Sequence, residues 1–202
     1  MSPPSPIPAA RQPDPVDRAT LRRHLLETRR QLEQRPARDH SLGLALERSL
    51  LRLRPRCIGA YCAIRGEFDP LPLLQRLGLS IALPRVEREA RRMEFAVWQP
   101  GQALHPGAYG IAEPGPDATV VDPDLLLLPC VGFASNGLRL GYGGGYYDRY
   151  LARRDAVFTI GLAYDALQVG HAQPEPHDRL LDLILTESAA FGRDAGLLPD
   201  AT

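Results

Sequence analysis

The chain has 202 residues, of which 44% are hydrophobic and 24% charged, and its 24 basic residues balance its 24 acidic residues. This composition fits one globular domain, and the balanced charge excludes a broad basic surface for nucleic acid. No apolar run approaches the roughly 18 residues of a membrane span, and no signal peptide is recognisable. Because the three cysteines form no CxxC pattern, we expect reduced thiols and a cytoplasmic protein. From its charge and apolar runs, we expect it to bind neither nucleic acid nor membranes.

The basic residues are all arginines, since the sequence contains no lysine. Chemistry that needs a lysine amine is therefore excluded, including a Schiff base and the Walker A phosphate loop. Positive charge in this protein comes from guanidinium groups, whose planar shape suits bidentate contacts with oxyanions.

The order of predicted elements begins with residues 1–16, whose six prolines predict a disordered tail. Helices are predicted at about 15–34, 39–53, 70–77 and 145–154, and strands at 57–63, 79–86, 93–98, 125–131, 157–164 and 180–187. A Gly/Pro-rich segment, 100–116, connects two of the strands. Alternating strands and helices predict a single α/β domain at 17–192 with a mainly parallel sheet flanked by helices, followed by a flexible tail at 193–202.

The segment RLGYGGGYYDRYL (139–151) places three consecutive glycines between a strand and a helix. Bare backbone N–H groups and the positive end of a helix then meet at one point, which is typical of a phosphate site. The segment lacks the GK[ST] ending of Walker A, and Tyr146 stands where the GxGxxG pattern requires its last glycine. A tight turn that uses glycine for steric reasons is the simpler interpretation.

The first helix carries an arginine stripe beside its leucine stripe. At 100° per residue, Arg18, Arg22 and Arg29 fall at about 0°, 40° and 20°, and the leucines at 21, 25 and 32 fall at about 300°, 340° and 320°. These arginines therefore border the core-facing side, where they could converge on a bound polyanion, whereas Arg23 points elsewhere. Exposure to solvent is the alternative.

Several carboxylates are candidates for ligand contacts. Asp148 lies one helical turn after the glycines, where an ion held by phosphates would find an oxygen ligand, although carboxylates also favour helix starts. Glu67 follows a strand, at the position where α/β sheets meet ligands, or is a solvated loop acid. Asp178 and Asp182 flank the beginning of the last strand, and either could be a metal ligand or a cap. His171 and His177 are expected to be surface residues.

Taken together, these motifs resemble the 5-formyltetrahydrofolate cyclo-ligase family, also called 5,10-methenyltetrahydrofolate synthetases. The resemblance runs from about Arg18 to Ser188, and its most specific motif is GLRLGYGGGYYDRYL. Supporting segments are YCAIRGEFD, ALPRV, MEF, YGIAEP and HDRLLDLILTES, together with Arg22 and Arg29 at a spacing of seven. Arg18 departs from the family, which usually has lysine there.

The resemblance implies a single three-layer α/β domain and an ATP- and Mg²⁺-dependent enzyme that cyclises 5-formyltetrahydrofolate to 5,10-methenyltetrahydrofolate, releasing ADP and phosphate. ATP contacts are implied for Arg18, Arg22, Arg139, Leu140, Gly141, Tyr142, Gly143, Gly144, Gly145, Tyr146 and Tyr147. Folate contacts are implied for Glu67, Tyr142, Gly143, Gly144, Gly145 and Tyr146. Magnesium would be held by Asp148 and Asp178, and the catalytic residues would be Arg139, Tyr146 and Asp148. We expect a monomer.

The implied reaction needs no protein nucleophile, because positioning and charge neutralisation suffice once the formyl oxygen faces the γ-phosphate of ATP. Two other classes use similar elements. A sugar-phosphate isomerase or acyl-CoA transferase relative would bind phosphate without hydrolysing ATP and would use Glu67 as a base. A nucleotide- or folate-binding module would show no turnover.

Overall fold

The computed structural model describes residues 17–154, 156–170, 175 and 178–197. The predicted tail at 1–16, His171, His177 and the last five residues of the predicted C-terminal tail lie outside this range. The helices are α1 (Arg18–Arg30), α2 (Arg35–Leu53), α3 (Leu71–Arg76) and α4 (Tyr146–Leu151), with short 3₁₀ turns η1 (Ala108–Gly110), η2 (Asp165–Leu167) and η3 (Ala195–Leu197). Across these ranges no helix is long and apolar enough to cross a bilayer.

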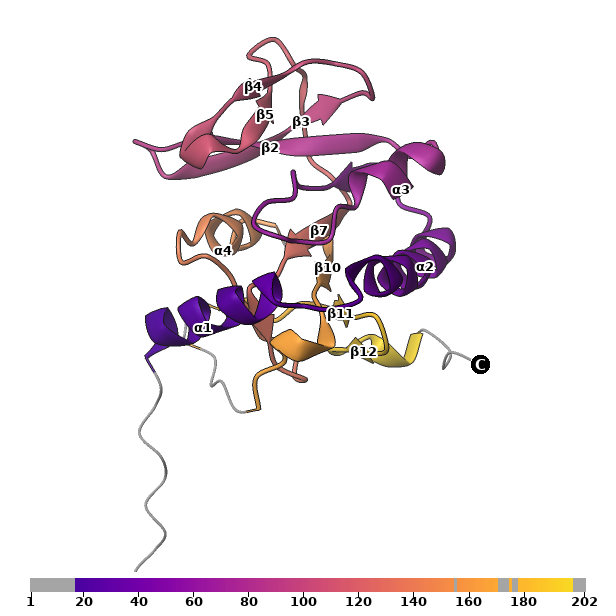
Figure 1. Ribbon diagram of the computed structural model, residues 1–202. Coiled ribbons are helices and arrows are strands. Elements are labelled where there is room, and N and C mark those ends of the chain that lie inside the picture. The colour runs from indigo at the N-terminus through magenta and orange to yellow at the C-terminus, as the bar shows by residue number, and fades with distance from the viewer. Residues whose placement is uncertain (1–16, 155, 171–174, 176–177, 198–202) are drawn as a thin grey trace, which may run out of the picture.

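The centre of the fold is an eight-stranded mixed sheet (Figure 1). In spatial order its strands are β12 (Ala190–Phe191), β11 (Leu183–Leu185), β10 (Phe158–Leu162), β7 (Leu125–Pro129), β1 (Ile58–Gly59), β2 (Ile81–Glu87), β3 (Arg92–Trp98) and β6 (Val120–Val121). The five strands from β11 to β2 are parallel, whereas β12, β3 and β6 pair antiparallel at the edges. The predicted mainly parallel sheet is confirmed.

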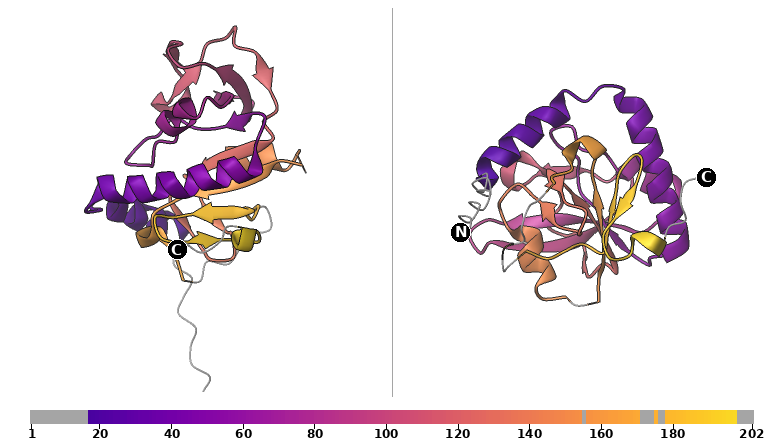
Figure 2. Two further views of the ribbon diagram at one scale, coloured as in Figure 1. Left: turned by 90° about the vertical axis from the view of Figure 1, so that its right-hand side faces the viewer. Right: turned by 90° about the horizontal axis from the view of Figure 1, so that it is seen from below.

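Two hydrophobic layers cover the two faces of this sheet. Along β7, Leu125 and Leu127 pack with side chains of α1, α2 and α3, whereas Leu126 and Leu128 pack with side chains of α4. This alternation follows from the two-residue period of a strand, and it explains why a strand buried on both faces is leucine at four successive positions. Helices α1 and α2 accordingly lie on one side of the sheet and α4 on the other (Figure 2), which makes three layers.

Helices α1 and α2 begin at residues other than the predicted ones. Helix α1 begins after Asp17, whose side chain accepts a hydrogen bond from the Thr20 amide at 3.1 Å, rather than at Pro15. Helix α2 begins at Arg35 instead of 39, directly after Gln34 in the left-handed conformation (φ 53°). Pro36 therefore lies in the first turn of α2, where its missing N–H costs nothing.

The sequence prediction missed several short strands. The Gly/Pro-rich segment contains a hairpin of β4 (Leu104–Pro106) and β5 (Ala112–Pro114), and β8 (Gly132–Phe133) pairs with β9 (Arg139–Leu140). The predicted strand at 57–63 is reduced to Ile58–Gly59. Proline is compatible with edge strands, and two- or three-residue strands leave no periodic signal in the sequence.

One edge of the sheet gathers the segments expected to carry the site. After β1 the chain runs through the loop that holds Glu67, and after β7 it runs through Cys130 and the β8–β9 hairpin into the glycine segment. Both loops follow the carboxyl ends of neighbouring parallel strands, which is where α/β sheets bind ligands.

Asp182 lies elsewhere: its carboxylate accepts hydrogen bonds from the Thr159 amide and hydroxyl at 2.9 and 2.7 Å, in agreement with a structural role.

Candidate active site

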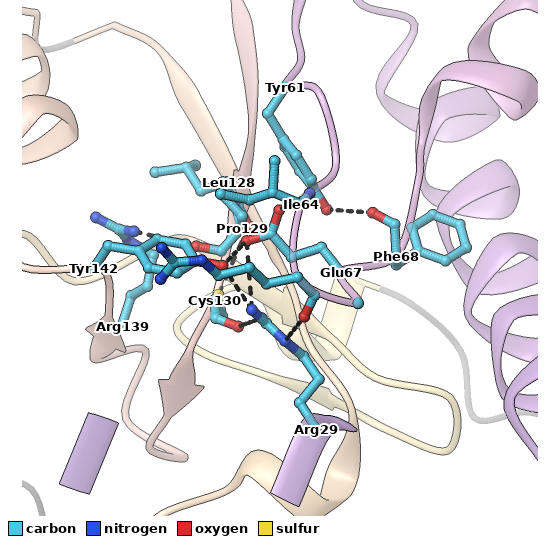
Figure 3. A network of polar contacts seen from close by, with 12 residues as sticks. Arg29, Tyr61, Ile64, Glu67, Phe68, Leu128, Pro129, Cys130, Arg139 and Tyr142 are labelled. Carbon is cyan, nitrogen blue, oxygen red and sulfur yellow. Dashed lines mark hydrogen bonds and ion pairs between the residues drawn. The ribbon is translucent and has the colours of Figure 1, made fainter. Parts of the chain in front are cut away.

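The most buried charge at this edge is Arg29 of α1, whose side chain is 1% exposed. Its Nε donates to the Arg65 carbonyl at 3.1 Å, its Nη1 to the Cys130 carbonyl at 3.1 Å and its Nη2 to the Tyr142 hydroxyl at 2.6 Å (Figure 3). The same Nη2 lies 3.8 Å from Oε1 of Glu67. One guanidinium group thus joins α1, the loop after β1, the end of β7 and the glycine segment.

Glu67 is also buried, and both of its carboxylate oxygens are engaged. Oε1 accepts a hydrogen bond from the Tyr142 hydroxyl at 2.6 Å, and Oε2 accepts one from the Ile64 amide at 2.9 Å. Burial raises the pKa of Glu67, and the hydrogen bond from Tyr142 and the charge of Arg29 act in the opposite direction. Burial also raises the pKa of Tyr142. Glu67 is therefore an interior carboxylate that faces the glycine segment, and it is not a solvated loop acid.

Two arginines on one face of α1, Arg18 and Arg22, contact segments of the candidate site. Arg22 donates from Nε to the Gly141 carbonyl at 2.8 Å, and Arg18 forms ion pairs with Asp178 at 2.7 Å and Glu175 at 3.1 Å. A cleft of about 520 Å³ runs beside this face. It is lined by Ala19, Arg22, Arg23, Leu26, Glu27, Arg30 and Tyr142. The expectation that Arg23 points elsewhere is wrong, because Arg23 lines the same cleft, although the hydrogen bond it makes is to Thr20 within α1.

The glycines of the segment each have a steric reason. Gly143 and Gly145 adopt the left-handed conformation with φ of 95° and 64°, which side-chain-bearing residues rarely adopt. A Cβ atom at Gly144 would lie 2.9 Å from the Tyr146 ring. Residues 142–144 are exposed, so the backbone that these glycines shape is open to a ligand. Leu140, in contrast, is buried in β9 and could contact a ligand only through its backbone.

Each of the two predicted metal ligands, Asp148 and Asp178, lies beside an arginine. The hydrogen bond from Arg18 to Asp178 is the largest influence that raises the pKa of Arg18, and the charges of Glu175 and Asp148 add to it. Asp148 also lies 3.9 Å from Arg139, whose guanidinium stacks on Tyr147 at 5.2 Å and donates to the Pro129 carbonyl at 3.2 Å. Asp148, in the first turn of α4 after the glycine segment, and Asp178 are ligands of the kind that Mg²⁺ takes. This ion usually binds one or two protein carboxylates and completes its shell with phosphate and water.

Nucleophilic catalysis by cysteine does not fit this site. Burial raises the pKa of Cys130 to about 12 and that of Cys62 to about 11, so both remain thiols near neutral pH. Within the described residues, no three histidine, cysteine, aspartate or glutamate side chains gather as a transition-metal site would require. The chemistry that remains is positioning and stabilisation of anionic groups by arginines and loop amides.

The fold and the site define a single-domain α/β protein that presents an exposed glycine-rich loop and a buried carboxylate at the carboxyl edge of its sheet. A sequence model of the 5-formyltetrahydrofolate cyclo-ligase family matches residues 15–187. The chain therefore belongs to this family of ligases.

Named relatives and solved structures agree with this assignment. The 5-formyltetrahydrofolate cyclo-ligase of Mycolicibacterium smegmatis is 28% identical over 85% of this chain and 94% of its own length. The Escherichia coli enzyme of the same name is 32% identical over 66% and 79%. The 5,10-methenyltetrahydrofolate synthetase structure from Aquifex aeolicus superposes with a TM-score of 0.74 at 26% identity, covering 92% of this chain and 94% of that one.

The arginine stripe put Arg29 beside a possible polyanion, but the residues implied to contact ATP or folate did not include it. The angular position of Arg29, between the leucine stripe and Arg22, was the available signal. It showed that the side chain borders the core, but the four groups that surround the guanidinium come from segments 36 to 113 residues away, which no local pattern reveals.

The raised pKa of Glu67 generates a prediction about stability and pH. Between the unfolded and the folded pKa of Glu67, the folded protein binds a proton that the unfolded chain does not. Stability therefore falls as the pH rises through this window, and it stays lower above the folded pKa. As the pH rises from about 4 to about 8, wild type should lose stability relative to Glu67→Gln, by about 1.4 kcal/mol for each unit of raised pKa. Melting temperatures across this range provide the measurement. Glu33→Gln, at an exposed position, is the control, and a difference that stays constant with pH would contradict the prediction.

Proposed function

We propose that this protein catalyses the ATP-dependent cyclisation of 5-formyltetrahydrofolate to 5,10-methenyltetrahydrofolate. The observation that carries the proposal is the double attachment of the glycine segment. Its Gly141 carbonyl is held by Arg22 of α1, and its Tyr142 hydroxyl is held by Glu67. An exposed phosphate-binding backbone therefore lies between an arginine-lined cleft and a buried carboxylate, which together suit a nucleotide and a second, polar heterocycle.

ATP belongs on the side of α1. Arg22 faces the cleft and already contacts the loop, so its guanidinium can neutralise phosphate oxygens while loop amides donate to them. We assign the triphosphate to Arg18, Arg22 and the backbone from Arg139 to Tyr147. Arg18 forms an ion pair with Asp178, so phosphate binding would redistribute its contacts.

Folate belongs on the side of Glu67. A pterin ring presents N–H donors along one edge, and a buried carboxylate with raised pKa is a strong acceptor for them once the site is closed to water. The Tyr142 hydroxyl donates a hydrogen bond to Oε1 of Glu67. The substrate and Tyr142 therefore compete for the same oxygen, and folate binding releases the glycine segment from one of its two attachments.

Asp148 and Asp178 would hold magnesium, which would neutralise phosphate charge. The remaining work falls to the chain. Arg139, in contact with Asp148 and Tyr147, orients the carboxylate, and the loop aligns the γ-phosphate with the formyl group. Tyr146, at the start of α4, would contact the substrates where the loop ends.

The reaction then needs two displacements. The formyl oxygen attacks the γ-phosphorus, and the bond to the ADP oxygen breaks. The N10 amine next attacks the activated formyl carbon and loses its proton, and phosphate leaves with the original formyl oxygen. Both steps join groups that are already bound, which agrees with a site that lacks a thiolate nucleophile.

One assay tests the proposal directly. Protein, ATP, Mg²⁺ and 5-formyltetrahydrofolate are mixed, and ADP and the methenyl chromophore are followed together. ADP release that depends on the folate, with equal amounts of methenyl product, is expected. Folate-independent phosphate chemistry or binding without turnover would overturn the proposal. We further propose that the protein acts in the cytoplasm as a monomer; its three unpaired cysteines support a reducing compartment, and light scattering tests the monomer.

Arg22 generates the first functional prediction. Arg22→Ala should raise the KM for ATP by at least about tenfold, the effect of losing a charge-assisted hydrogen bond of 1.5–3 kcal/mol, and leave the KM for folate nearly unchanged. Arg23→Ala should have a smaller effect, because Arg23 lines the cleft without contacting the loop. Arg52→Ala, exposed on α2, is the control. Equal effects at positions 22 and 23 would show that the contact with Gly141 is irrelevant to ATP.

Tyr142 generates the second. Because its hydroxyl competes with folate for Glu67, Tyr142→Phe should tighten folate binding in the absence of ATP by about threefold to tenfold, which corresponds to roughly 1 kcal/mol. Isothermal calorimetry measures the affinity. Tyr150→Phe removes a hydroxyl that contacts Asp122 on the other face of the sheet and should change nothing. Weaker binding by Tyr142→Phe would mean that the hydroxyl binds the substrate directly.

Asp148 generates the third. Asp148→Asn keeps the size of the side chain and removes its charge, so the Mg²⁺ concentration for half-maximal turnover should rise by at least about tenfold. The thermal stabilisation of the protein by Mg²⁺–ATP should shrink in parallel, while the melting temperature without ligand stays near that of wild type. Asp117→Asn, at an exposed position, is the control. An unchanged Mg²⁺ dependence would place the metal site elsewhere.

A further inference from the structure

A pair of tyrosines joins the glycine segment to the YGIAEP motif at 109–114. The proposed function assigns no role to this motif. The hydroxyls of Tyr109 and Tyr146 lie 2.9 Å apart, and their rings meet edge to face with centroids 5.9 Å apart. Tyr109 belongs to η1, between β4 and β5, in the part of the molecule that lies above α4 in Figure 1. Its side chain is 60% exposed, so burial in a core does not explain this contact.

The backbone of the motif holds Tyr109 in a disfavoured conformation. Tyr109 has φ 60° and ψ 16°, in the left-handed region that tyrosine rarely adopts. Glu113 of the same motif fixes the turn, because its Oε1 accepts a hydrogen bond from the Ala108 amide at 3.1 Å. Strained residues that neighbouring contacts hold in place cluster at ligand sites. The motif therefore presents an exposed aromatic ring in a fixed orientation.

The guanidinium groups of two arginines lie over this tyrosine pair. The Arg88 guanidinium lies 4.8 Å from the centre of the Tyr109 ring, and that of Arg149 lies 4.9 Å from the centre of the Tyr146 ring. Arg149 also donates to the carbonyls of Gly144 at 2.9 Å and Arg91 at 3.0 Å. It thereby joins the tip of the β2–β3 hairpin to the glycine segment.

Positive charge on this surface is not balanced locally. Throughout the described part of the chain, no carboxylate lies within ion-pair distance of Arg88 or Arg91, whereas the neighbouring Arg92 pairs with Glu87 at 3.1 Å. The hydrogen bond with Tyr146, followed by the charges of Arg88 and Arg91, lowers the pKa of Tyr109. Arg88 lies over the Tyr109 ring, and Arg91 belongs to the same exposed turn, since its amide donates to the Arg88 carbonyl at 3.2 Å. Exposed guanidinium groups next to aromatic rings suit a ligand that carries both an aromatic ring and carboxylates.

We propose that Tyr109, Tyr146, Arg88 and Arg91 form a subsite for the aminobenzoyl-glutamate end of the folate substrate, with the arginines binding its carboxylates. The inference rests on the proposed function and adds the residues that recognise the far end of the substrate. Tyr142, beside Glu67, and Tyr146 are four residues apart, so at most about 14 Å of chain separates the pterin end from this subsite. An elongated molecule with a heterocycle at one end and carboxylates at the other matches this arrangement. The ATP-facing arginines, Arg18 and Arg22, come from α1 instead.

A comparison of two substrates tests the subsite. 5-Formyltetrahydrofolate carries the glutamate, and 5-formyltetrahydropteroate has the same reacting groups without it. Wild type should favour the folate in kcat/KM, and Arg88→Ala/Arg91→Ala should lose roughly a factor of ten of that preference, as expected for two exposed ion pairs. Turnover of the pteroate and the KM for ATP should stay as in wild type. The wild-type preference should also shrink as salt concentration increases.

Control and contrary outcomes are well separated. Arg92→Ala removes a neighbouring arginine that is already paired, and it should retain the full preference for the folate. An equal loss on both substrates, no loss on either, or a raised KM for ATP with the preference retained would each overturn the subsite. Failure of the proposed function itself would look different, because wild type would then form methenyl product from neither substrate.

Discussion

The arrangement of this site depends on the burial of one positive charge. Arg29 is 1% exposed, and a guanidinium group removed from water must find acceptors for its donors or the fold loses several kcal/mol. Its acceptors are the carbonyls of Arg65 and Cys130 and the hydroxyl of Tyr142, with the Glu67 carboxylate close by. Because these groups belong to three different segments, satisfying Arg29 fixes how α1, two loops and the sheet edge lie relative to one another.

The glycine segment is the element on which this arrangement acts. It is held at its start by Arg22 and Tyr142 and at its end by Arg149 and the Tyr109–Tyr146 pair. Between these attachments the exposed glycines leave the backbone uncovered. A loop that is anchored at both ends and bare in the middle can approach phosphates closely, with little reorganisation when they bind. The left-handed conformations of Gly143 and Gly145 make that shape possible.

Buried thiols, raised tyrosine pKa values and the lack of lysine point to the same style of catalysis. The side chains around the site donate hydrogen bonds, carry fixed positive charge or accept N–H donors, and none of them is set up as a nucleophile. Such a site accelerates a reaction by aligning two bound substrates and neutralising transferred charge. The ligase family to which the chain belongs has a reaction of this kind in its name, the closure of a ring.

The sequence by itself determined what depends on neighbouring residues. Leucine runs and their periodicity predicted the α/β class, the glycine motif predicted an anion loop, and helical spacing put Arg18, Arg22 and Arg29 on one face of α1. Short edge strands such as β4 and β5 escaped prediction because three residues carry no period. Only the tertiary structure decided that Arg29 is buried. It also decided that Tyr142 hydrogen-bonds Glu67, that Arg18 pairs with Asp178 and that the hydroxyls of Tyr109 and Tyr146 are in contact. These partners lie 37 to 160 residues apart, and their contacts exist because packing the helices on the sheet brings distant segments to one edge.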